Sequence, residues 1–168
     1  MHRRTFLATV ALSTSNAMAV NETPPRRRVE LDDTTFAWWH QDARLFGELS
    51  APTEGWLAVG FNNEATLRGT RFVIGVINHN ITLAQWHIAD PPNHHPIRGL
   101  GGLSDIRDLQ GEIRHGRSTL AFSLPAHNTG RFAIDLSPDR SVHMMLAWSH
   151  HKNFQHHSAW RRHIDLIL

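Results

Sequence analysis

The densest group of side chains that could do chemistry lies near the C-terminal end, between Ser149 and His157. Four of these residues are histidines, His150, His151, His156 and His157. Each of the first two stands six residues before one of the second two, which favours a loop folding back on itself over one helical face. Because copper and zinc both accept imidazole nitrogen, two or three of these side chains could hold such an ion. The alternative is a polar loop that is simply rich in histidine, and we favour it for His150, His151 and His156 taken singly.

Composition narrows the possible chemistry. The chain has 14 histidines but no cysteine among its 168 residues, which excludes disulfides, iron–sulfur clusters, thiolate zinc sites and covalently attached haem. Arg3 and Arg4 lie in the predicted leader, so the 17 basic residues fall to 15 and match the 15 acidic ones. This balance gives no electrostatic basis for nucleic-acid binding. No nucleophile-elbow sequence, zinc-hydrolase motif or close carboxylate pair occurs, so an independent enzyme is the least supported class.

Two apolar, β-branched runs at residues 55–63 and 72–77 form the predicted core and must position this chemistry. Neither run alternates cleanly between polar and apolar residues, which indicates strands covered on both faces, as at the centre of a sandwich. From Val29 onward, short strands recur about every ten residues with turn residues between them. We therefore predict an all-β fold, a single immunoglobulin-like antiparallel β-sandwich over residues 34–168.

Turn chemistry predicts two hairpins and one long loop. Asn78-His79-Asn80 forms the first hairpin turn, since asparagine tolerates the left-handed conformation that such turns need. His115-Gly116-Arg117 forms the second. Residues 90–102 contain three prolines, three glycines and two adjacent histidines, so we predict an irregular loop that is functional or mobile.

The N-terminal residues 1–19 have the features of an export signal. A basic start precedes a short apolar stretch at 6–12, and Ala17-Met18-Ala19 is a small-x-small cleavage site. The segment Arg3-Arg4-Thr5-Phe6-Leu7 resembles the bacterial twin-arginine signal, with an ordinary secretory signal as the alternative. The apolar stretch is too short to span a bilayer. We expect a bacterial periplasmic or secreted protein in which residues 20–33 form a flexible lead-in.

The two core runs, read with their flanking residues, resemble the DOMON family of extracellular β-sandwich domains. The matching pieces are Gly-Trp-Leu-Ala-Val-Gly-Phe-Asn from residue 55, Leu-Arg-Gly-Thr from residue 67, the second core run, His95-Pro96 before Leu-Gly-Gly, and His157-Ser158 before Arg161-Arg162. Their order resembles that of the short bacterial members and covers roughly residues 34–168. Members of this family bind b-type haem in cytochrome-like electron carriers, or are thought to bind sugars or other small ligands.

The resemblance implies a haem site with one altered position. Haem-binding members hold the iron between a methionine before the second core strand and a histidine near the C-terminus. His157 matches the histidine, but Leu67 stands at the methionine position and cannot ligate iron. Haem b could therefore be held by His157 alone, could take a sixth ligand from one of three other histidines, or could be absent. Those three histidines are His79, His94 and His95.

Three functions remain open on the sequence. The one we favour is non-covalent binding of b-type haem for periplasmic electron transfer with a redox partner protein. The residues that the resemblance places at this cofactor are His157, Leu67, Gly69, Phe72 and His95. The second is a haem-free module for a sugar or another small molecule, for which an exposed Trp38-Trp39 pair could be a platform. The third is copper or zinc binding by the histidine-rich loop.

Overall fold

A computed structural model describes residues 24–168 of the chain, and the predicted signal at 1–19 lies outside the described residues. Eleven strands and one short 3₁₀ helix, η1, account for its regular structure. Their bounds are β1 Arg27–Leu31, β2 Thr34–Gln41, β3 Arg44–Ala51, β4 Leu57–Asn62, β5 Arg71–Asn78, β6 Ile81–Asp90, β7 Asn93–Pro96, η1 Ile97–Leu100, β8 Arg107–Arg114, β9 Arg117–Pro125, β10 Ser141–Trp148 and β11 Trp160–Ile167. Within residues 24–168, no helix is long and apolar enough to cross a membrane.

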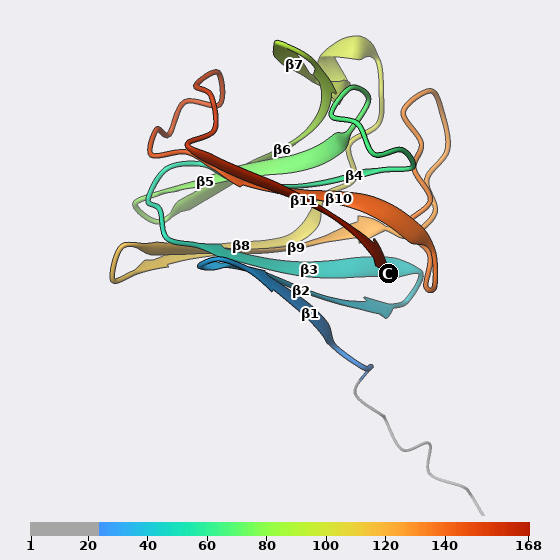
Figure 1. The fold of residues 1–168 in the computed structure, drawn as a ribbon, viewed down its shortest axis with the longest axis horizontal. Coiled ribbons are helices and arrows are strands. Elements are labelled where there is room, and N and C mark those ends of the chain that lie inside the picture. The colour runs from blue at the N-terminus through green and yellow to red at the C-terminus, as the bar shows by residue number, and fades with distance from the viewer. Residues whose placement is uncertain (1–23) are drawn as a thin grey trace, which may run out of the picture.

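The strands form two antiparallel layers packed face to face (Figure 1). One layer has the order β1-β2-β3-β9-β8, and the other has the order β11-β10-β4-β5-β6-β7. Strands β4 and β5, which hold the two apolar runs, pair with each other at the centre of the six-stranded layer. The predicted all-β antiparallel sandwich is therefore confirmed.

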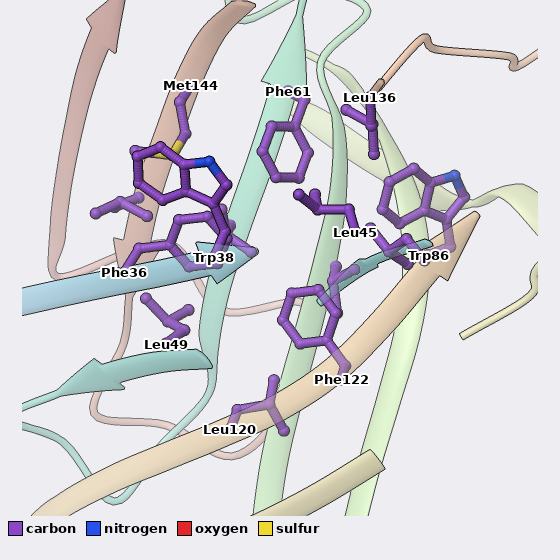
Figure 2. Packing of buried hydrophobic residues seen from close by; sticks show 14 of the residues in the cluster. Phe36, Trp38, Leu45, Leu49, Phe61, Trp86, Leu120, Phe122, Leu136 and Met144 are labelled. Atoms are coloured by element: carbon purple, nitrogen blue, oxygen red, sulfur yellow. The ribbon is translucent and has the colours of Figure 1, made fainter. Parts of the chain in front are cut away.

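The main core fills the space between the layers because each strand sends alternate side chains inward. In β3, Leu45 and Leu49 are fully buried and face Phe122 of β9 and Phe61 of β4 within one cluster (Figure 2). Burying one such side chain contributes about 1.5–3 kcal/mol to folding. Trp38 belongs to the same core and is only 4% exposed, so the Trp38-Trp39 pair does not form the exposed sugar platform considered above.

A second apolar cluster covers the outer face of the six-stranded layer, the face turned away from the five-stranded layer. Its buried members are Trp56, Ala58, Phe72, Ile74, Val76, Ala89, Met145 and Ala147, and Leu67 and Phe154 pack against them. Both faces of β4 are consequently buried along its whole length. This explains why the core runs lack alternation, and it leaves an apolar surface on which a ligand can lie.

Two segments are more regular than the sequence predicts. Strand β1 lies within the predicted flexible lead-in 20–33 and pairs with β2 from Arg27 onward, so the sandwich begins before residue 34. The predicted irregular loop 90–102 contains β7, which pairs with the end of β6, and then η1. The two predicted hairpins are confirmed, with His79 and His115 at positive φ in their turns.

Candidate functional site

A cavity of about 340 Å³ opens on the outer face of the six-stranded layer. Its floor is apolar and consists of Trp56, Ala58, Phe72, Ile74, Met145 and Ala147. Its walls come from Leu67, from the β6–β7 turn with His94, and from the β10–β11 loop with His157 and Arg161 beyond it. In Figure 1, the β10–β11 loop and β7 both rise on the side of this layer away from the five-stranded layer.

The β10–β11 loop is attached to the segment that leads into β4. Thr53 Oγ1 donates a hydrogen bond to the carbonyl oxygen of Ser149 at 2.6 Å, and the backbone N–H of Trp56 donates to the carbonyl of His151 at 3.0 Å. Gly55 lies so close that a Cβ at this position would come within 2.1 Å of the Ser149 oxygen. The glycine that opens the first core run is therefore required by the close approach of this loop.

The same loop presents His156 and His157 to the cavity, whereas its His150 and His151 do not line it. The indole Nε1 of Trp56 donates to the carbonyl of His156 at 3.2 Å, next to His157, which is exposed and lines the cavity. The rings of His151 and His156 stack with their centroids 3.9 Å apart, and His150 packs against Trp148. Across residues 24–168, no three or more histidine, aspartate or glutamate side chains are grouped to hold a metal ion.

Leu67 reaches the cavity from the loop between β4 and β5. Asn62, the last residue of β4, holds this loop because its Nδ2 donates to the carbonyl oxygens of Thr66 at 2.8 Å and Arg68 at 3.1 Å. Gly69 follows with φ +80°, a conformation that glycine adopts without steric cost. The loop thus places the half-buried Leu67 side chain against the floor of the cavity. Leucine has no sulfur or nitrogen that could bind a metal ion.

The other residues predicted at the site are divided between the cavity and the surface. Phe72 is buried in the floor, whereas Gly69 lies in the loop beside Leu67. His95 is exposed on β7 and does not line the cavity, while its neighbour His94 does. His79 lies at the exposed tip of the β5–β6 hairpin, also outside the lining. Of the three histidines considered for a sixth ligand, only His94 is in the cavity wall.

His94 belongs to a chain of side chains that the sequence did not reveal. Its Nδ1 lies 2.8 Å from Nδ1 of His87, and Nε2 of His87 lies 2.8 Å from Oε1 of Gln85. His87 is only 1% exposed and packs against Phe72. Gln85 and His87 occupy alternate positions of β6, and this period of two is the signal that could have placed both on the outer face.

The environment of both histidines favours the neutral imidazole. Burial lowers the pKa of His87 to about 4, and positive charge on His94 and His95 lowers it in the same direction. Burial also lowers the pKa of His94, against an opposing effect from the Phe154 carbonyl, and positive charge on His95 and His157 adds to the decrease. A neutral imidazole keeps one nitrogen lone pair, the form that binds metal ions.

The fold has counterparts among solved structures. The cytochrome b domain of pyranose dehydrogenase from Coprinopsis cinerea aligns with a TM-score of 0.61 and 11% identity, over 80% of this chain and 76% of that one. The cytochrome domain of cellobiose dehydrogenase from Myriococcum thermophilum aligns with a TM-score of 0.60 and 9% identity, over 85% of this chain and 81% of that one. At these identities the similarity shows the fold alone, the two-layered antiparallel β-sandwich that these cytochrome domains share with this chain.

Sequence comparison adds nothing to the structural result. No family model matches the chain, and no curated protein matches it either.

Proposed function

We propose that this protein binds b-type haem in the outer-face cavity and acts as an electron carrier, with His157 as an axial ligand. The observation that carries this proposal is that His157 and Leu67 line the same cavity above an apolar floor. These are the two positions that the family resemblance pairs on opposite sides of the iron. The structural neighbours, whose names describe them as cytochrome domains, support the same cofactor.

The cavity suits a porphyrin in its chemistry. Part of the lining consists of small side chains, which would let a flat ligand approach the sheet closely. They are those of Ala58, Ala89 and Ala147. Arg161 brings a guanidinium group to the lining, and arginine pairs well with carboxylates such as haem propionates. Because the chain has no cysteine, attachment must be non-covalent and depends on these contacts and the axial ligands.

Each group has a definite role in this proposal. Haem b, when bound, supplies a one-electron change at its iron. His157 would bind the iron from the β10–β11 loop, and the apolar floor would limit the access of water to the haem, which affects the reduction potential. With the export signal expected at residues 1–19, this carrier would be periplasmic or secreted, and a redox partner protein would exchange electrons with it there.

Reconstitution with haemin tests the role of His157. The full mature chain should bind haemin with a sharp Soret band, and His157→Ala should weaken and broaden that band. His150→Ala is the matched control, because His150 lies in the same loop but outside the cavity lining. An unchanged Soret band in His157→Ala would show that His157 does not bind the iron. If the wild-type protein binds no haemin, the proposal fails, and the haem-free module for a sugar or another small molecule becomes the function to test.

A further inference from the structure

We propose that His94 is the second axial ligand of the haem, in place of the sulfur that Leu67 cannot supply, and that His87 and Gln85 hold its ring in the ligating form. This inference rests on the proposed function, because it names a further ligand of the same site. It selects His94 from the three histidines that the sequence left open for the sixth ligand, and it adds a role for His87 and Gln85, which the sequence did not single out.

The position of His94 follows from the β6–β7 hairpin. In this hairpin His94 pairs with Ala89, and both residues line the cavity. The ring of His94 lies edge-on to Phe72 in the floor, with the centroids 5.4 Å apart. Leu67, His156 and His157 line the same cavity. His156 comes from the same loop as His157 and stacks on His151, so His94 is the imidazole that a different element supplies.

Hydrogen bonding through His87 determines which nitrogen of His94 is free. The Gln85 Oε1 atom can only accept, so Nε2 of His87 carries a proton and donates to it. In a neutral imidazole the other nitrogen, Nδ1 of His87, then has only a lone pair and accepts the Nδ1–H of His94. This arrangement leaves Nε2 of His94 without a proton, which is the form that an iron ligand requires, whereas the Phe154 carbonyl beside the ring acts in the opposite sense and favours the protonated ring.

The hydrogen bonds that join Gln85, His87 and His94 satisfy a buried polar ring and can also orient His94. A polar ring that is 1% exposed is costly unless both nitrogens are hydrogen-bonded, and Gln85 and His94 satisfy them. Histidine ligands of metals generally donate their second N–H to an outer partner that fixes tautomer and orientation. His87 is placed to be that partner, and it is therefore a positioning residue.

Met145 is the principal rival, because its thioether could also bind iron. Its side chain is 4% exposed, and its terminal methyl lies 3.2 Å from the place of a Cβ on Gly60, so it runs along the floor toward β4. His94 stands in the wall instead, where His87 holds its Nδ1 and Nε2 takes no part in that bond. Spectroscopy distinguishes a nitrogen ligand from a sulfur ligand, so it can tell His94 from Met145 as the second ligand of the iron.

The test uses the haemin-loaded full mature chain and reads the iron spectrum. The wild-type protein should be low-spin and six-coordinate, with the electron paramagnetic resonance and near-infrared magnetic circular dichroism signatures of two histidines. His94→Ala should become five-coordinate and high-spin, and added imidazole should restore the low-spin spectrum. His95→Ala is the matched control, since it removes the neighbouring exposed imidazole, and it should leave the wild-type spectrum unchanged.

The outcomes separate this inference from the proposed function. If haemin binds and depends on His157 but His94→Ala stays low-spin, or the wild type shows histidine–methionine ligation, the inference fails and the proposed function stands. If no haemin binds, the proposed function itself fails. Adding Leu67→Met to His94→Ala should give a histidine–methionine spectrum, which verifies that the double variant folds and that its cavity accepts porphyrin.

His87→Gln tests the positioning role separately. Loss of an outer partner typically lowers metal affinity about 10- to 100-fold. The ferrous His87→Gln protein should therefore bind carbon monoxide about tenfold more tightly than wild type, because the weakened His94 is displaced more easily. An unchanged carbon monoxide affinity, with only a lower unfolding temperature, would show that His87 is merely structural.

Discussion

At the scale of single residues, the buried His87 makes the stability of the haem-free protein depend on pH. Its pKa is about 4 in the folded state and 6.5 when unfolded, so between these values the unfolded chain binds the extra proton. The free energy of unfolding should therefore fall as pH decreases from 6.5 to 4, and His87 should add nothing further below 4. This difference corresponds to a loss of about 3 kcal/mol.

Urea denaturation at a series of pH values measures this effect. His87→Gln should show a flatter profile than wild type between pH 6.5 and 4, because glutamine does not titrate. His115→Asn serves as the control, since His115 is exposed in a turn with φ +51° that asparagine tolerates. A His87→Gln profile parallel to that of wild type would show that His87 titrates normally in the folded protein.

At the scale of elements, the β10–β11 loop depends on the absence of a side chain at Gly55. A Cβ there would lie 2.1 Å from the Ser149 oxygen and 2.6 Å from the His150 carbonyl carbon, so Gly55→Ala must push the loop away. We expect a loss of about 2 kcal/mol or more in unfolding free energy, as for other strained substitutions. Haemin affinity should fall as well, because the same loop carries His157.

Gly99→Ala is the control for this substitution. The nearest atom to a Cβ at Gly99 is 3.7 Å away, which is ordinary contact distance, and Gly99 lies in η1 rather than in the loop. Thermal unfolding and haemin titration of both variants check the expectation. Wild-type stability and affinity in Gly55→Ala would mean that the loop is not held by its close approach to this glycine.

Several elements could be predicted from local sequence, and others could not. Turn residues located the β5–β6 and β8–β9 hairpins, although the left-handed residue of the first turn is His79 rather than the asparagine on either side of it. β7 was missed because its four residues follow two prolines and end in a third, and its pairing with the end of β6 is a tertiary contact. β1 was missed because a run of arginines predicts a solvated tail, although its backbone pairs with β2.

At the scale of the whole molecule, the sandwich could be predicted but the cavity could not. Apolar runs without alternation indicated strands covered on both faces, yet they do not say whether protein or ligand covers the second face. The structure shows a second apolar cluster on that face, with Leu67 and His157 brought to it from positions 90 residues apart. Which of the adjacent His94 and His95 faces the cavity depends on the register of β7, which pairing with β6 determines.

The central claim is that haem occupies the outer-face cavity, and a floor substitution tests it without changing any histidine. Ala147 is a buried floor residue on β10, so Ala147→Phe fills the space where a porphyrin would lie. Ala159→Phe adds the same ring at an exposed position after the loop and is the matched control. Far-ultraviolet circular dichroism verifies that both variants retain the sandwich.

Haemin titration followed at the Soret band is the deciding measurement. Wild type and Ala159→Phe should bind one equivalent with the same affinity, whereas folded Ala147→Phe should lose at least about tenfold in affinity from overpacking of the floor. Equal binding by all three proteins would contradict the account, because the haem would then lie outside this cavity.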